Sequence, residues 1–168
     1  MKEFDELIDG YDAPADSPGG RQAAKDVVKA FFTAIGEHDL QLMASCLADD
    51  TINEFPFSES GRTEEGAFRV YRGKAEVIAS WEAAFSIEGE RLPYTDLDIT
   101  INADGSRVFV EAHGYLLRAS GRHYQNRYVF RFDVLNGKIV RSKEYFNPIQ
   151  TAYAFQRPIA GRYAIESL

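Results

Sequence analysis

One carboxylate near the C-terminus lies among aromatic residues, a setting in which an ionisable side chain can do proton chemistry. Glu144 is followed by Tyr145 and Phe146. The aromatic residues of a facing run are Tyr124, Tyr128, Phe130 and Phe132. Because an apolar environment disfavours a charged carboxyl group, we expect the pKa of Glu144 to rise toward neutrality, which suits a general acid or base. The alternative is that Glu144 pairs with Arg127 or Arg131 on the neighbouring strand and has no chemical role.

A histidine is the second candidate for acid/base chemistry. His113 follows Glu111 by two residues, so both share one face of an extended strand. If that face lines a cavity, Glu111, His113 and Glu144 form a cluster whose pKa values are pushed apart. If the face points outward, they are surface or interface residues. The apolar opposite face, which includes Val108 and Val110, favours this alternative.

Other side chains of the same region are candidates for ligand binding. Alternation along residues 124–133 places Tyr124, Asn126 and Tyr128 on an inner face. Tyr128 and Asn126 can then donate hydrogen bonds to a ligand. For Asn126, a partner within the protein is an equally good interpretation, because a buried amide needs partners of either kind.

Three further candidates precede or lie on a helix in the middle of the chain. Trp81 is interpreted first as a core residue and second as a stacking surface for a planar ligand. Tyr71 and Arg72 border the expected cavity, where Arg72 can bind a ligand carboxylate in a bidentate way. The alternative, which is more common for an arginine at such a place, is that Arg72 is a surface charge.

A β-hairpin must position Glu144. Asn136-Gly137 separates two β-rich runs, residues 122–135 and 138–146, and Asn-Gly is the strongest short signal for a two-residue turn. Further strands are expected over residues 51–57, 95–102 and 107–118.

Helices are expected before these strands. Apolar residues at steps of three and four predict a helix over residues 21–36 that ends at Gly36, and another over residues 73–85. Asp39 is a predicted N-cap for a short helix between them. Helices followed by antiparallel strands indicate an α+β fold, in which the helices cover one face of a strongly curved sheet around a cavity.

The domain organisation follows from composition. Residues 1–20 are acidic and interrupted by proline and glycine, so we expect a loose N-terminal arm. Residues 21–155 form one domain, residues 156–168 form a C-terminal tail, and the polar loop over residues 58–66 is a candidate lid.

Composition also restricts the class of function. The chain of 168 residues has 19 basic and 26 acidic residues, a net charge of −7, which argues against nucleic acid and anionic membranes as partners. A single cysteine, Cys46, excludes an internal disulfide, and no signal peptide or apolar span is visible, so we expect a cytoplasmic protein. The histidines lack zinc-site spacing and no nucleotide-binding motif is present, so no metal and no cofactor are expected.

Three sequence blocks carry a family resemblance. They are F-F-T-A-I-G-E-H-D-L with L-A-D-D-T-I-N-E-F-P, then Y-R-G-K-A-E-V-I-A-S-W, and finally N-G-K-I-V-R-S-K-E-Y-F-N-P. In this order, over roughly residues 24–155, they resemble the NTF2-like superfamily and, within it, the SnoaL-like proteins. The resemblance implies a cone-shaped α+β domain around a cavity.

Within this superfamily, the terminal block is most similar to the phenazine-biosynthesis A/B-type branch. That resemblance implies a cytoplasmic dimer that binds a carboxylated ring compound, with Glu144 at the position of an acid/base glutamate. The same branch has a histidine where this chain has Ser80. The ketosteroid isomerase branch fits less well, because its aspartate falls at Phe55 and its tyrosine falls near Phe31. Ser80 and Phe55 are therefore further candidates for substrate contact.

These observations predict a cofactor-independent acid/base enzyme that acts on a small cyclic or aromatic metabolite, as an isomerase, a lyase-type dehydratase, a cyclase or a condensation-assisting protein of secondary metabolism. The rival hypothesis is a non-catalytic small-molecule binding or accessory protein. We also expect a homodimer, on the expectation that Val108, Val110 and Val129 lie on the outer face of the sheet.

Overall fold

The computed structural model describes residues 2–58, 60–87, 90–91, 94–117, 121 and 123–158. The helices are α1 (Lys2–Asp9), α2 (Pro18–Glu37), α3 (Leu40–Cys46), α4 (Lys74–Ile87) and α5 (Pro148–Phe155). The strands are β1 (Leu47–Glu54), β2 (Val70–Arg72), β3 (Glu90–Arg91), β4 (Thr95–Ile101), β5 (Arg107–Leu117), β6 (His123–Leu135) and β7 (Lys138–Phe146). The helices expected in the first half and the strands β4 to β7 are confirmed, whereas α1, α5, β2 and β3 were not predicted.

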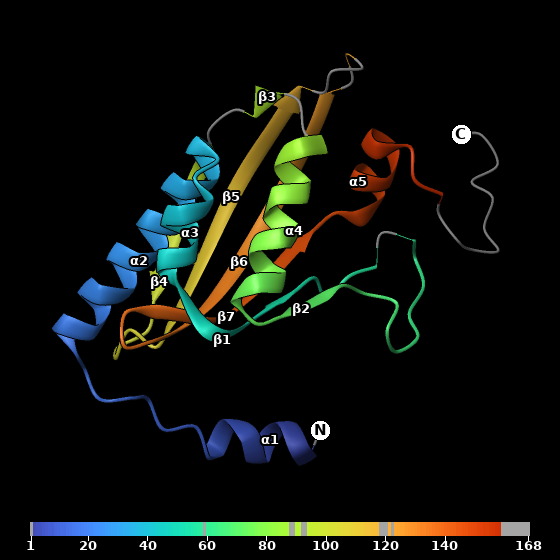
Figure 1. Ribbon diagram of the computed structural model, residues 1–168. Helices are drawn as coiled ribbons and strands as arrows, with labels where there is room; N and C mark the ends of the chain where they lie inside the picture. The colour runs from blue at the N-terminus through green and yellow to red at the C-terminus, as the bar shows by residue number, and fades with distance from the viewer. Residues whose placement is uncertain are drawn as a thin grey trace.

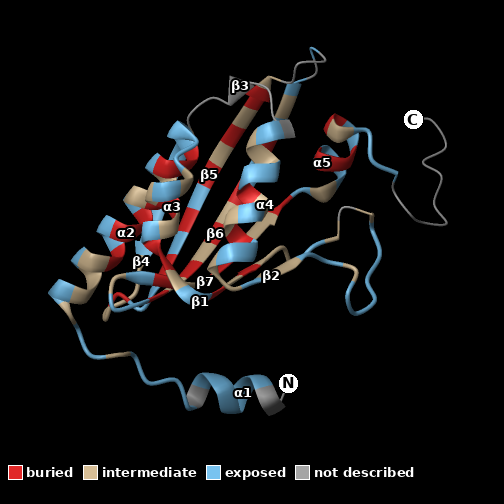
Figure 2. Ribbon diagram, in the orientation of Figure 1, coloured by how far each residue is buried: buried red, intermediate tan, exposed pale blue. Residues whose placement is uncertain are grey.

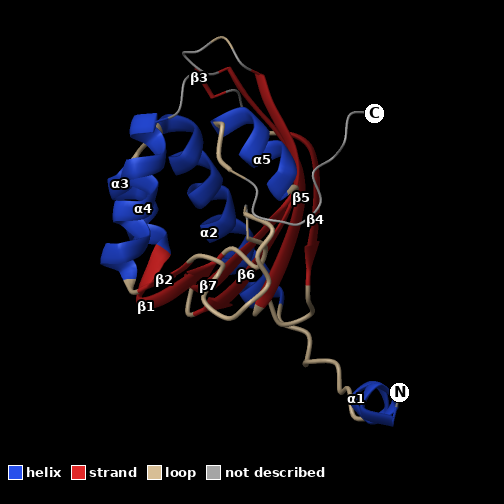
Figure 3. Cartoon of the chain, turned by 90° about the vertical axis from the view of Figure 1, so that its right-hand side faces the viewer, coloured by secondary structure: helices blue, strands red, loops and turns tan. Residues whose placement is uncertain are grey.

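The strands form one curved sheet with helices on its inner side (Figures 1 and 3). Its order is β2-β1-β7-β6-β5-β3, and β4 also pairs with β5. The pairs are antiparallel except β1–β7, which is parallel, so the expectation of a purely antiparallel sheet was wrong for this pair. β1 and β7 lie far apart in the chain, so no hairpin forces them to run in opposite directions.

The predicted hairpin between β6 and β7 is confirmed. Asn136 and Gly137 have φ angles of 51° and 69°, as a two-residue turn with two left-handed positions requires. The ladder that follows pairs Phe130 with Glu144 and Tyr128 with Phe146. The turn therefore sets the register that brings Glu144 beside the aromatic residues of β6.

The C-terminal end of α2 differs from the predicted one. Gly36 does not end α2, which continues to Glu37, and His38 ends it in a left-handed conformation with φ 55°. The His38 ring stacks on Phe85 of α4 with 4.3 Å between ring centroids. This packing stabilises a residue other than glycine at the helix end. Asp39 caps α3 as predicted, since its side chain accepts a hydrogen bond from the backbone N–H of Leu42.

The core lies between the helices and the inner face of β5 and β6 (Figure 2). Phe31 of α2 packs edge-to-face on Phe132 of β6, with 5.6 Å between the ring centroids. Val108 and Val110 of β5 are on this inner face and are 0% and 1% exposed, so their expected outward position was wrong. Val129 does lie on the outer face and is half-buried. The homodimer remains a prediction, without the support of the first two valines.

The N-terminal arm contains a helix that was not expected there. α1 lies apart from the sheet and the other helices in both views (Figures 1 and 3), and the side chains described in it are exposed (Figure 2). None of the described helices, α1 included, is long and apolar enough to cross a membrane.

Candidate functional site

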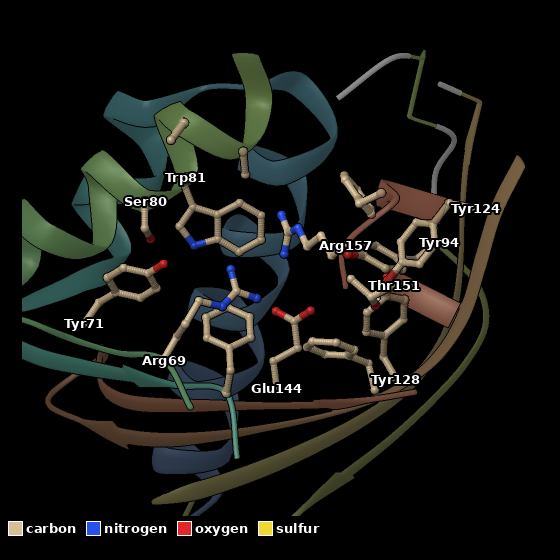
Figure 4. A pocket seen from close by; sticks show the side chains of 15 residues that line it. Arg69, Tyr71, Ser80, Trp81, Tyr94, Tyr124, Tyr128, Glu144, Thr151 and Arg157 are labelled. Atoms are coloured by element: carbon tan, nitrogen blue, oxygen red, sulfur yellow. Dashed lines mark hydrogen bonds between the residues drawn. The ribbon is translucent and has the colours of Figure 1, made fainter. Parts of the chain in front are cut away.

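A pocket of about 210 Å³ opens between the inner face of the sheet and the helices α4 and α5 (Figure 4). Its walls are mainly aromatic, with one carboxylate and two guanidinium groups among the described lining residues. The residues that line it are Phe55, Arg69, Tyr71, Ser80, Trp81, Ala83, Ala84, Tyr94, Tyr124, Tyr128, Glu144, Phe146, Thr151, Phe155 and Arg157.

Glu144 reaches this pocket because β7 places it on the inner face. It is in register with Phe130, and its carboxylate points into the pocket (Figure 4). The alternative pairing with Arg127 or Arg131 was wrong. Arg127 bonds to Asp96 at 2.9 Å and Arg131 bonds to Asp133 at 2.8 Å, both on the outer side of the sheet. Glu144 is therefore a pocket residue and does not pair with either of these arginines.

Two arginines missed by the sequence analysis line the same pocket. Figure 4 shows the guanidinium groups of Arg69 and Arg157 entering the space around the Glu144 carboxylate. The Arg69 guanidinium lies 4.3 Å from the centre of the Phe55 ring, which orients it by a cation–π contact. Arg72 is exposed and is not among the described lining residues, so of its two interpretations the structure favours a surface charge.

The sequence contained a signal for the position of Arg69 but none for that of Arg157. Arg69 precedes Tyr71 by two residues, so the period of two along an extended segment would have placed Arg69 on the same face as Tyr71. Arg157 lies in the expected tail, and no periodicity points to it. Its backbone N–H donates to the carbonyl oxygen of Ala152 at 2.9 Å and closes the end of α5, so the helix cap determines its position.

A chain of hydroxyl groups forms one wall of the pocket. The Tyr128 hydroxyl donates to that of Tyr124 at 2.9 Å, and the Tyr124 and Thr151 hydroxyls are 3.1 Å apart. Thr151 in turn donates to the carbonyl oxygen of Asn147 at 3.3 Å. Because Tyr124 accepts from Tyr128 and from Asn126, its own proton is directed to Thr151. Tyr128 thus presents oxygen lone pairs to the pocket, as an acceptor and not as the expected donor.

Asn126 lies behind this wall and is 4% exposed. Its amide donates to the Tyr124 hydroxyl and to the carbonyl oxygen of Asn147, both at 3.0 Å, and its carbonyl accepts from the Asn147 N–H at 2.9 Å. These bonds use the amide's hydrogens, so Asn126 does not line the pocket as a ligand donor. Of the two interpretations, the structure favours partners within the protein. Its role is to hold the start of α5 against β6.

The two tyrosines of the wall stay protonated at neutral pH. Burial raises the pKa of Tyr128 far above its usual value, and the neighbouring Tyr124, Tyr94 and Glu144 raise it further. Burial also raises the pKa of Tyr124, although the hydrogen bonds that its hydroxyl shares with Thr151, Tyr128 and Asn126 oppose this effect. Both hydroxyls therefore serve as neutral hydrogen-bonding groups and not as anionic bases.

The opposite wall comes from α4 and the strand pair β1–β2. Trp81 packs edge-to-face on Phe31 at 6.0 Å between ring centroids and also lines the pocket. Its place in the core is confirmed, and stacking on a planar ligand stays a prediction. The Ser80 hydroxyl donates to the carbonyl oxygen of Val77 at 2.7 Å. Phe55 and Tyr71 meet edge-to-face at 6.1 Å. All four lie at the pocket as expected.

The expected cluster of Glu111, His113 and Glu144 does not form. β5 turns Glu111 and His113 to the outer face, where His113 is in register with Arg127 and its Nδ1 lies 4.0 Å from the Asp96 carboxylate. Glu144 lies on the inner face, so the sheet separates it from His113. The described residues of the loop 58–66 do not line this pocket either.

Comparison with known proteins shows to which family this chain belongs. A model of the SnoaL-like domain matches residues 28–142, which is most of the folded domain. The chain belongs to the SnoaL-like family. A search of curated proteins finds no match to this SnoaL-like sequence.

Solved structures agree with this fold. A candidate isomerase from Bacillus subtilis has a TM-score of 0.72 at 20% identity, over 85% of this chain and 99% of the other. A phenazine biosynthesis-related protein from Pseudomonas aeruginosa has a TM-score of 0.69 at 19% identity, over 99% of both chains. A candidate polyketide cyclase from Xanthomonas campestris has a TM-score of 0.65 at 23% identity, over 83% and 99%. At these identities the likeness shows the shared NTF2-like fold.

Proposed function

We propose that this SnoaL-like protein is a cofactor-independent acid/base enzyme that isomerises, cyclises or dehydrates a small cyclic metabolite. The observation that carries the proposal is that one carboxylate, Glu144, and two guanidinium groups, those of Arg69 and Arg157, enter the same aromatic pocket. Similar folds are named after isomerase and cyclase activities, which favours this class of reaction.

In the proposed reaction, the Glu144 carboxylate removes a proton from a carbon next to a carbonyl group of the substrate. The electron pair of the broken C–H bond moves to the carbonyl oxygen, and Arg69 or Arg157 stabilises the negative charge that develops there. A guanidinium group is always protonated, so it acts by charge and hydrogen bonding without giving up a proton. Protonated Glu144 then returns the proton at another carbon or to a leaving hydroxyl group.

The pocket restricts the substrate by size and by polarity. A volume of about 210 Å³ is smaller than the roughly 300–1,000 Å³ of pockets for drug-sized ligands, which favours a single substituted ring. The flat walls of Trp81 and Tyr94 suit such a ring. The guanidinium groups favour a carboxylate on the ring, and the Tyr128 oxygen favours a hydroxyl or amine that donates to it.

A non-catalytic binding protein is the second candidate. The observation in its favour is that Glu144 is the one carboxylate among the described lining residues, with no histidine beside it. The hydroxyl of Ser80 is also engaged with the Val77 carbonyl oxygen. A binder of this kind requires the same arginines and aromatic walls but no proton transfer.

Solvent deuterium exchange distinguishes these candidates without knowledge of the natural substrate. Small cyclic ketones with a ring carboxylate are incubated with the protein in heavy water, and loss of the proton next to the carbonyl is followed by NMR. We expect exchange by the wild type and a decrease of about 100-fold or more in Glu144→Gln. Glu111→Gln, on the outer face, is the matched control and should retain the wild-type rate. Equal rates in Glu144→Gln and wild type would disprove the role of Glu144, and binding without exchange would favour the second candidate.

A further inference from the structure

α1 exposes an apolar face that contacts nothing in its own domain. Phe4, Leu7 and Ile8 follow the helical spacing of three and four residues, Tyr11 continues it just after the helix, and the four side chains are 57–70% exposed. The rest of the described helix surface is acidic, with Asp5 and Glu6 exposed beside this face. A helix of eight residues is short, about 12 Å long, and its stability depends on packing of its apolar face.

A second groove, which shares Tyr94 with the lining of the Glu144 pocket, is also apolar and exposed. It lies between α2 and the inner side of the edge strand β4 and has a volume of about 580 Å³. Its apolar lining includes Phe32, Leu97, Ile99 and Ile101, of which Leu97 and Ile99 are 55% and 52% exposed. Residues 95–100 of β4 are exposed although α2 lies beside this strand, so the described elements leave this end of the sheet largely uncovered.

The charges of the groove complement those of α1. Lys25 and Lys29 of α2 are exposed and line the groove, with Glu37 at the far end of the same helix. Lysines beside an apolar groove favour a helix that carries acids beside its apolar face. The described part of α1 has this arrangement, with Asp5 and Glu6 next to Phe4, Leu7 and Ile8.

We propose that α1 of a second copy of this chain docks in the groove between α2 and β4, and that the exchange is reciprocal in a dimer. The apolar face around Leu7 would lie on Phe32, Leu97 and Ile99, and the acids of α1 would lie near Lys25 and Lys29. Such packing covers both exposed apolar surfaces at once.

The connection between α1 and the domain favours exchange between copies. Its domain end is held in place: the Ser17 N–H donates to the carbonyl oxygen of Ala103 at 2.9 Å, and the Arg21 side chain bonds to the same oxygen at 3.0 Å. Pro14 restricts the backbone in the middle of the connection. From this anchor the chain leads α1 away from α2 and β4, the two elements that line the groove, in both views (Figures 1 and 3). Residues 10–17 span at most about 26 Å when extended, enough to reach a neighbouring copy.

Photo-crosslinking of the full-length protein tests this inference. p-Benzoylphenylalanine in place of Phe4 puts a reactive aromatic probe on the apolar face, and the same probe in place of Asp5 is the matched control on the acidic face. An equal mixture of heavy-nitrogen-labelled and unlabelled protein is irradiated, and the crosslinked peptides are identified by mass spectrometry. We expect dimers in which the probe at position 4 is attached to residues 25–37 or 94–101, with mixed isotope composition. The probe at position 5 should give much less of this product.

Two groove variants test the chemistry of the contact. Leu97→Asp puts a carboxylate in the apolar groove and should lower the yield of crosslinked dimer about tenfold. Lys25→Glu with Lys29→Glu should lower it at low salt and less at high salt, because salt screens exposed charges. Crosslinks within one isotope-pure chain would show that α1 folds onto its own groove. Crosslinks elsewhere, or none, would show that the groove does not bind α1, and each of these results would overturn the proposal.

Discussion

Asn126 should contribute to stability far more than its exposed neighbours, because it joins β6 to the start of α5. Asn126→Ala removes a long hydrogen bond of 3.4 Å to the Thr151 hydroxyl and three shorter ones, to the Tyr124 hydroxyl and to the N–H and carbonyl groups of Asn147. At about 1 kcal/mol for each of the shorter bonds, their sum is about 3 kcal/mol. Asn147 is exposed, so water can replace part of this bonding, and we expect a net loss of about 2 kcal/mol.

Two measurements check this value. Urea denaturation followed by circular dichroism gives the free energy of unfolding, and the melting temperature should fall by about 4–8 °C for a domain of this size. Hydrogen exchange then locates the effect. The backbone amides of α5 should exchange faster in the variant, whereas those in the centre of β5 should change only with the global stability.

Gln125→Ala is the matched control, since Gln125 is the exposed residue adjacent to Asn126 on the other face of β6. It should change the free energy of unfolding by less than about 0.5 kcal/mol. A loss in Asn126→Ala as small as in this control would refute the reasoning, because it would mean that water fully replaces the amide. Unchanged exchange in α5 would refute the assigned link between β6 and that helix.

The other predictions concern a carboxylate, a glycine and a pocket arginine. Partial burial raises the pKa of Asp133, but hydrogen bonds and charges of two arginines outweigh it and lower the pKa below its usual value. Its stabilising effect is thus present above the unfolded pKa and is lost as the pH falls through the folded value; Asp133→Asn should cost about 1 kcal/mol at pH 7 and progressively less as the pH is lowered, measured by urea denaturation. Gly114→Ala would put a Cβ 2.7 Å from a ring carbon of Tyr128, so it should destabilise by about 1–3 kcal/mol; an unchanged denaturation midpoint would contradict this. Arg69→Gln should weaken binding of a ring carboxylate about tenfold or more by calorimetry, and the exposed control Arg72→Gln should not.

The sequence predicted the part of the fold that depends on local patterns. The Asn136-Gly137 turn and the period of two along β6 and β7 were enough to place Glu144 and Tyr128 on the inner face. The period of three and four along residues 21–36 was enough to find α2. These patterns result from backbone geometry, which acts over a few residues.

The prediction failed where the outcome depends on distant parts of the chain. Alternation along β5 separated His113 from Val108 correctly but did not show which of the two faces the helices cover. The parallel pairing of β1 with β7 joins segments more than 80 residues apart. The same is true of Arg157, which lines the pocket together with Arg69 and Tyr71. The sequence also could not predict the direction of the hydrogen bonds along the hydroxyl chain. That direction depends on tertiary contacts, in which Tyr124 donates to Thr151 and Thr151 donates to the carbonyl oxygen of Asn147.

The charge balance of the pocket connects binding with chemistry. Its described lining has two arginines and one glutamate, a net charge of +1 when Glu144 is ionised. A ligand with one carboxylate would bring the enclosed charge to zero, which matters because an uncompensated charge is costly away from water. Removal of a proton by Glu144 then transfers the negative charge from the glutamate to the substrate while both guanidinium groups remain in place. The total charge in the pocket is the same before and after this step, so the arrangement that favours binding of a monoanion also favours movement of the proton within it.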